Sequence, residues 1–194
     1  VSSSELRNFG RQVHLNWRIQ RTKTVGVGLV LCLNIGIDPP DVFRCPPCAR
    51  LEAWLDPARA PSAVSAENIA KSLQSQYEPW QARARVRVAV KPTKEDLRRL
   101  CVTLRRYAKA DRVLIHYNGH GVPRPTVNGE VWVFDRQYTQ YIPVSIFDIQ
   151  TYAGGPGIYV FDCASAGRTV HWYRRFIELR EENGEAFGEQ LKDC

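Results

Sequence analysis

The segment Val113-Leu-Ile-His-Tyr-Asn-Gly-His-Gly121 starts as an apolar strand and ends in two glycines that flank a histidine. A second segment, Ile158-Tyr-Val-Phe-Asp-Cys-Ala-Ser-Ala-Gly167, follows a similar plan, because an apolar strand leads to a cysteine and a turn of small residues. In an open parallel sheet, functional groups gather beyond the carboxyl ends of the strands. The two segments therefore predict that His120 and Cys163 lie at one edge of a common sheet.

A histidine and a cysteine at one sheet edge are the groups that a cysteine peptidase needs. The thiolate attacks a carbonyl carbon, and the imidazole maintains the thiolate and then protonates the leaving amine. We therefore treat His120 and Cys163 as a candidate catalytic dyad. Six further residues are candidates for lining or binding in the same cleft: Asn118, Gly119, Gly121, Asp162, Ser165 and Gly167. The competing interpretation is a surface histidine and a cysteine that only fills the core.

Strand and helix patterns alternate along the rest of the chain. The apolar run 24–38 predicts a strand buried on both faces. Segment 82–90 alternates arginine with small apolar residues, as expected of a half-exposed strand near an edge. Shorter strands are predicted at 113–115, 131–134 and 158–161, and helices at 4–22, 62–77, 93–109, 145–152 and 168–192. This alternation predicts an α/β fold with a mainly parallel sheet, in a single domain over residues 1–194.

The composition is that of a folded, basic domain. Apolar residues make up 44% and charged residues 24% of the 194 residues, which excludes disordered and low-complexity chains. Lys plus Arg at 27 against Asp plus Glu at 20 leaves a net charge of +7. The longest apolar run falls short of the ~20 residues that a membrane span needs. Because the chain has no methionine and no signal-like start, we expect a segment of a larger protein.

Seven arginines are candidates for a basic surface. They are Arg83, Arg85, Arg87, Arg98, Arg99, Arg105 and Arg106. Such a surface attracts anions, but neither a nucleic-acid-binding motif nor an interleaved set of stacking aromatic residues accompanies it. We therefore expect no nucleic-acid partner, and both an acidic protein partner and a plain solvated face stay open.

Two proline-containing segments allow more than one interpretation. Cys45-Pro-Pro-Cys48 has the spacing of half a zinc site, but no second Cys or His pair follows at a suitable distance. We interpret it as a stiff turn and expect neither a metal nor a cofactor. Segment 123–134 is rich in turn formers, so it is either a hairpin that closes onto strand 131–134 or a rigid loop at the rim of the cleft.

Several long stretches resemble the N-terminal conserved domain of the Raptor family, the regulatory-associated proteins of the TOR kinase. Downstream they are 113–134, Tyr138-Thr-Gln-Tyr-Ile-Pro143 and Phe161-Asp-Cys-Ala-Ser-Ala-Gly167. Upstream they are Leu31-Cys-Leu-Asn-Ile-Gly-Ile-Asp-Pro-Pro-Asp41, Pro47-Cys-Ala-Arg-Leu-Glu52 and Gln76-Tyr-Glu-Pro-Trp-Gln81. The similarity extends over about residues 15 to 170, which makes it far more specific than a short motif.

The resemblance implies a caspase-like three-layer sandwich, with a mainly parallel central sheet and flanking helices, within a large scaffold protein of TOR complex 1. It implies TOR kinase and the substrates of the complex as protein partners. It also implies a cytoplasmic location, with recruitment to the lysosomal or vacuolar surface. The caspase-type histidine is then His120 and the cysteine is Cys163.

Two features of the cysteine segment weigh against catalysis. Active members of the caspase-like clan commonly carry Asp-x-Cys-x-x-Gly, whereas Cys163 directly follows Asp162, so Ala164 stands at the nucleophile position. One residue along a strand turns a side chain by about 180°. The charge of Asp162 is also expected to raise the pKa of the neighbouring thiol. We therefore expect a non-catalytic scaffold or adaptor domain, with a cysteine endopeptidase as the alternative.

Overall fold

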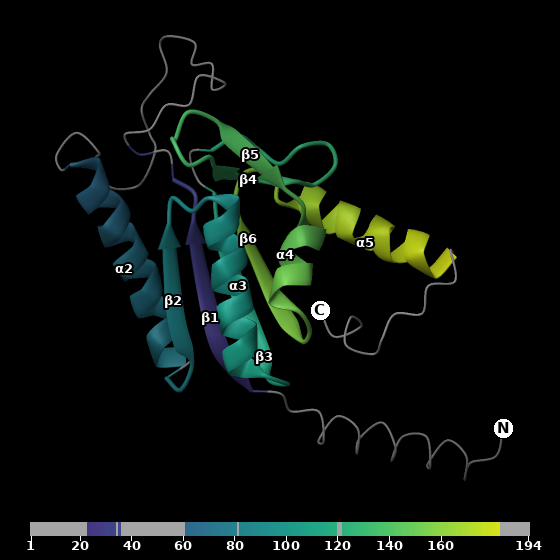
Figure 1. Ribbon diagram of the computed structural model, residues 1–194, viewed down its shortest axis with the longest axis horizontal. Helices are drawn as coiled ribbons and strands as arrows, with labels where there is room; N and C mark the ends of the chain where they lie inside the picture. The colour runs from purple at the N-terminus through teal and green to yellow at the C-terminus, as the bar shows by residue number, and fades with distance from the viewer. Residues whose placement is uncertain (1–22, 34, 36–60, 81, 120–121, 183–194) are drawn as a thin grey trace.

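The computed structural model describes residues 23–33, 35, 61–80, 82–119 and 122–182, and its centre is a four-stranded sheet (Figure 1). The strands are β1 (Thr24–Leu31), β2 (Arg85–Val90), β3 (Arg112–Asn118) and β6 (Gly157–Asp162), in the order β2-β1-β3-β6. All neighbouring pairs are parallel. The four carboxyl ends therefore meet at one edge, the upper one in Figure 1, which we call the carboxyl edge. The predicted α/β fold with a mainly parallel sheet is confirmed.

Helices cover both faces of this sheet. On one face, α2 (Ser62–Trp80) packs Ile69 and Ala70 against buried side chains of β1 and β3, including Leu29 and Leu114. The opposite face is covered by α3 (Lys94–Ala108) and α4 (Ile146–Ala153), which lie in front of the sheet in Figure 1. α5 (Gly167–Glu182) follows β6. Two helical layers around one sheet give the predicted three-layer sandwich.

α3 begins where the sequence predicts, at the N-cap Thr93. The Thr93 hydroxyl accepts a hydrogen bond from the Asp96 amide at 3.2 Å, and the Asp96 carboxylate accepts one from the Thr93 amide at 3.2 Å. This capping box satisfies two amides that the first helical turn leaves without partners. Acidic residues in the first turn and basic residues in the last also complement the helix dipole.

A close approach of α3 to β1 depends on a glycine in the apolar run. A Cβ atom added at Gly28 would lie 2.8 Å from Leu104 Cδ1, 2.9 Å from Ile115 Cδ1 and 3.0 Å from Leu100 Cδ2. Gly28 is buried, and these three side chains occupy the space that a side chain at position 28 would need. The glycine therefore sets how deeply the helix packs on the sheet.

A separate hairpin lies at the carboxyl edge. β4 (Val131–Phe134) pairs antiparallel with β5 (Tyr141–Val144), a strand that the residue pattern did not predict. The predicted hairpin within 123–134 is wrong, because 131–134 pairs with β5 and residues 123–130 form a loop. The Trp172 indole of α5 donates a hydrogen bond to the Val127 carbonyl of that loop. Residues 123–130 are therefore a loop that is attached to α5, whereas its position relative to the predicted cleft stays a prediction.

The predicted arginine stripe is divided. Six of the seven arginines are exposed: Arg83, Arg85, Arg87, Arg98, Arg99 and Arg106. Arg105 instead points away from that surface and donates hydrogen bonds to five backbone carbonyls: those of Lys109, Asp111, Ala153, Gly154 and Pro156. Arg105 is therefore a structural residue and not part of a basic surface, which corrects the sequence-based expectation.

Two further expectations concern membranes and metals. In the part of the chain that the structure describes, no helix is long and apolar enough to cross a membrane. Among the same residues, no group of three or more His, Cys, Asp or Glu side chains could hold a metal ion. The Cys45 and Cys48 pair and the predicted helix 4–22 lie outside the described residues.

Candidate functional site at the carboxyl edge

Adjacent strands bring three of the predicted site residues together at the carboxyl edge. Asn118 and Asp162 are register partners at the ends of β3 and β6, and the Asn118 amide donates to the Asp162 carboxylate at 3.2 Å. The Gly119 amide then donates to the Asp162 carbonyl at 3.0 Å. His120 and Gly121 lie outside the described residues. Segments 113–119 and 158–163 thus end side by side at the carboxyl edge.

Gly119 is the point at which the chain leaves β3. A Cβ atom there would lie 2.4 Å from Cε1 of Tyr117. The Tyr117 ring is held in place, because it is buried and its hydroxyl donates to the Trp132 carbonyl at 2.7 Å. A glycine is therefore required where β3 turns toward the site, and Tyr117 ties this turn to β4.

Cys163 follows Asp162, and its side chain points toward the core. Its side chain is half-buried and packs against the apolar cluster on the α3 side of the sheet. Burial raises the pKa of the Cys163 thiol above its ordinary value, and the charge of Asp162 raises it further. A nucleophilic cysteine needs the opposite shift, toward the thiolate. The surroundings of Cys163 therefore favour the unreactive thiol.

Ser165 and Gly167 lie in the turn that follows Cys163. Both residues are exposed, and Ser165 adopts a positive φ of 57°. The Ser165 carbonyl accepts the Arg168 amide at 3.0 Å, which closes the turn as α5 begins at Gly167. The structure thus places these two residues at the surface of the carboxyl edge, beside the strand end that carries Asp162.

His116 is a histidine near this edge that the sequence analysis passed over. It is buried, its Nδ1 lies 2.7 Å from the Tyr77 hydroxyl, and its Nε2 lies 4.0 Å from the Asp162 carboxylate. Side chains alternate along a strand, so His116 faces the α2 side whereas Tyr117 faces the α3 side. Because Cys163 packs on the α3 side, His116 and Cys163 lie on opposite faces and do not form a dyad.

The buried position of His116 makes stability depend on pH. Burial lowers the pKa of His116, and the charge of Asp162 opposes this effect. The unfolded chain then binds the proton more readily than the folded chain. Stability is therefore complete above the unfolded pKa of about 6.5 and is lost as the pH falls toward the lower folded pKa. We expect the free energy of unfolding, measured by urea titration, to decrease between about pH 7 and about pH 5.

A His116→Gln variant tests the origin of this dependence, because glutamine cannot titrate but still offers polar atoms to Tyr77. We expect the pH dependence to become weaker in this variant. The matched control is His171→Gln, since His171 is exposed on α5 and its replacement removes one histidine elsewhere. An unchanged pH dependence in His116→Gln would show that another group is responsible.

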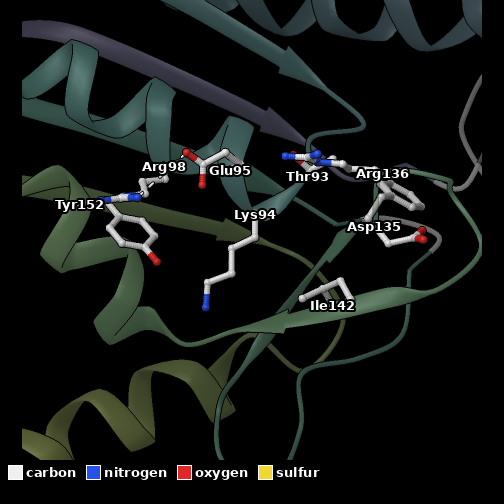
Figure 2. A pocket seen from close by; sticks show the side chains of 9 residues that line it. Thr93, Lys94, Glu95, Arg98, Asp135, Arg136, Ile142 and Tyr152 are labelled. Carbon is white, nitrogen blue, oxygen red and sulfur yellow. Dashed lines mark ion pairs between the residues drawn. The ribbon is translucent and has the colours of Figure 1, made fainter.

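A pocket of about 590 Å³ lies at the start of α3 (Figure 2). Its wall includes Phe134 and Ile142 of the hairpin and Tyr152 of α4, together with charged side chains at the rim. The charged residues are Lys94, Glu95, Arg98, Asp135 and Arg136, and Figure 2 shows them around one hollow. Lys94 already pairs with Asp148 at 3.0 Å. No sequence motif marks this pocket, because its lining comes from segments far apart in the chain.

Comparisons with known proteins agree with this architecture. The family model described as Raptor N-terminal CASPase like domain matches residues 22–173. A protein raptor homolog of Dictyostelium discoideum is 55% identical over 172 residues, which are 88% of this chain and 11% of that protein. The target of rapamycin complex 1 subunit KOG1 of Saccharomyces cerevisiae is 50% identical over 173 residues, again 88% of this chain and 11% of that protein.

A solved structure supports the same relationship. The crystal structure of Chaetomium thermophilum Raptor matches with a TM-score of 0.71 and 47% sequence identity, over 85% of this chain and 15% of that one. The chain thus spans only a small part, 11%, of the length of the two curated relatives described above. The family model nevertheless covers most of the chain and includes all the strands of the sheet. The chain therefore belongs to the Raptor N-terminal caspase-like domain family.

Proposed function

We propose that this chain is a non-catalytic scaffold domain of TOR complex 1, which binds TOR kinase and helps to present substrates of the complex. The names of its relatives support this proposal, since one is a regulatory-associated protein of TOR and two are subunits of target of rapamycin complex 1. The scaffold then acts in the cytoplasm and at the lysosomal or vacuolar surface where the complex is recruited.

The observation that carries the non-catalytic part of the proposal is the environment of Cys163. Its thiol packs toward the core, and both burial and Asp162 raise its pKa. Among the described residues, no cation or imidazole offsets these effects on the pKa of Cys163. His116 is on the opposite face of the sheet, and burial lowers its pKa, which favours the neutral imidazole over the cation.

A cysteine endopeptidase that uses His120 and Cys163 is the second candidate. Its support is the placement of Cys163 directly after β6, next to the strand end that leads into Gly119 and His120. The scaffold proposal expects the same placement of Cys163, because this placement follows from the fold. Activity is therefore the property that separates the two candidates.

The two candidates predict opposite results for a Cys163→Ala variant of the full-length protein. The scaffold proposal predicts that the variant co-purifies as much TOR kinase as the unaltered protein. It also predicts that neither protein cleaves a peptide library. Because the pKa of Cys163 is raised, iodoacetamide is expected to label it no faster than a free thiol at neutral pH, as measured by peptide mass spectrometry.

Cleavage of the library by the unaltered protein, lost in Cys163→Ala, would support the endopeptidase. Failure of the unaltered full-length protein to co-purify TOR kinase would overturn the scaffold proposal. The buried Cys101 serves as an internal control for labelling, since burial raises the pKa of its thiol to about 12.

A further inference from the structure

The outer edge of β2 carries backbone groups without partners in the described part of the chain. β2 stands at the end of the sheet and pairs with β1 alone among the described strands. The Lys91 amide donates to the Leu31 carbonyl of β1 at 2.8 Å. Successive residues of a strand direct their N–H and C=O groups to opposite sides. The backbone groups of Val86 and Val88 therefore point outward, away from β1.

The side chains of β2 divide into a basic and an apolar face. Val86 and Val88 pack against the cluster beneath α2, whereas Arg85 and Arg87 lie on the α3 side and are exposed. The Arg85 guanidinium carbon lies 5.4 Å from the centre of the Tyr107 ring of α3. Among the described residues, no acidic side chain forms an ion pair with Arg85 or Arg87.

α3 extends this basic face. One flank of the helix is covered by α4, where Arg98 lies over the Tyr152 ring. The other flank carries Tyr107 toward Arg85 of β2, and Arg99 and Arg106 are exposed on the outer face of the helix, opposite its buried residues. Arg99 lies 3.8 Å from the Asp96 carboxylate, and the two side chains are 69% and 47% exposed. Arg85 and Arg87 on β2 and Arg99 and Arg106 on α3 therefore add exposed positive charge on the same side of the sheet.

We propose that the outer edge of β2 binds an extended acidic segment of a partner protein by strand addition. In this mode, outward backbone groups of Val86 and Val88 bond to the added strand, and alternate side chains of that strand give specificity. Acidic residues at every second position would face Arg85 and Arg87, because side chains alternate with a period of two. The intervening side chains would face the α2 side, where apolar residues fit.

The positive charge of the β2 edge favours an acidic strand over a second copy of this chain. Charged residues on an edge strand commonly prevent sheets from joining edge to edge. Two copies of this basic edge would repel each other, which disfavours a second copy of the chain as the added strand. An acidic strand meets attraction instead, and the exposed arginines speed its encounter. This inference is independent of whether the protein binds TOR kinase.

The test uses the full-length protein and a fluorescent synthetic peptide of alternating glutamate and valine, with binding measured by anisotropy. We expect Arg85→Glu with Arg87→Glu to weaken binding by at least about tenfold. The matched control is Arg174→Glu with Arg175→Glu, which reverses the same number of charges on exposed residues of α5. Its affinity should stay close to that of the unaltered protein.

Two altered peptides separate strand addition from general attraction. A peptide of the same composition with all glutamates in one block loses the alternation. A peptide N-methylated at every second amide loses backbone donors but keeps its charge. Both should bind at least about tenfold more weakly. Equal binding of either peptide, or equal competition by an RNA oligonucleotide, would overturn the proposal in favour of a general anion-binding surface.

Hydrogen exchange tests whether the peptide binds at β2. We expect the amides of Val86 and Val88 to exchange slowly only when the alternating peptide is bound, since they point outward in the free protein. Slow exchange of these amides before the peptide is added would show that another segment of the full-length protein already covers the edge. Protection elsewhere, without any at β2, would also overturn the proposal.

Discussion

Replacement of Arg105 by methionine is expected to lower the free energy of unfolding by about 3 kcal/mol. The guanidinium bonds to the carbonyls that end α3 and start the next turn, Lys109 at 3.1 Å and Asp111 at 2.8 Å. It also bonds to the chain between α4 and β6, at Ala153, Gly154 and Pro156. Methionine keeps the aliphatic stem but removes all five of these hydrogen bonds, and the Pro156 carbonyl keeps its bond from the Val113 amide. Urea unfolding of the two proteins measures the difference.

The control for Arg105→Met is Arg106→Met, because Arg106 is the exposed neighbour on the same helix and the same charge is removed. This control should change stability by less than about 0.5 kcal/mol. An Arg105→Lys variant should lie between the two, since a single ammonium cannot reach the carbonyls of both segments at once. Equal stabilities of Arg105→Met and Arg106→Met would show that the carbonyls find other donors.

Replacement of Gly28 by valine is expected to cost a similar amount, about 3 kcal/mol. The added Cβ would fall 2.8 Å from Leu104 and 2.9 Å from Ile115, and the two methyl groups of valine would need further space. α3 must then move away from β1, or its leucines must leave their preferred rotamers. The shift should appear in urea unfolding and as faster hydrogen exchange in α3.

Gly167→Val is the matched control for Gly28→Val, because a Cβ added at Gly167 meets no atom within 4 Å. Gly28 lies in a strand and Gly167 at the start of a helix, but intrinsic preferences of valine and glycine differ by at most about 1 kcal/mol in either, less than the expected packing effect. We expect Gly167→Val to change stability by less than about 1 kcal/mol. A Gly28→Val protein as stable as this control would mean that the helix repacks without strain.

Local patterns predicted most of the regular structure. The charged first turn behind Thr93 correctly identified the start of α3, because capping depends on residues close in sequence. The alternating arginines of 82–90 correctly indicated an edge strand, since one face of such a strand meets water. β5 was missed because Tyr141–Val144 is short, contains Pro143, and is a strand only through its pairing with β4.

The candidate site was predicted less completely. In the structure the two segments end side by side, where Asn118, Gly119 and Asp162 lie together. The partnership of His116 with Tyr77 joins residues far apart in the chain, so no local pattern contains it. The pocket at the start of α3 was missed for the same reason. Arg105 was grouped with other arginines because charge alone does not reveal which carbonyls a side chain reaches.

The sequence by itself determined the elements, their order and the family, because these depend on periodicity, capping residues and long matching stretches. Only the tertiary structure decided which way key side chains face. Cys163 stands next to Asp162 in the chain, yet it packs toward the α3 side while Asp162 lies beside His116 on the other. Gly28 interrupts an apolar run in the sequence. A glycine is needed at this position because α3, residues 94–108, packs closely against β1 there. Contacts of this kind depend on the relative positions of distant segments, which are fixed only when the core packs.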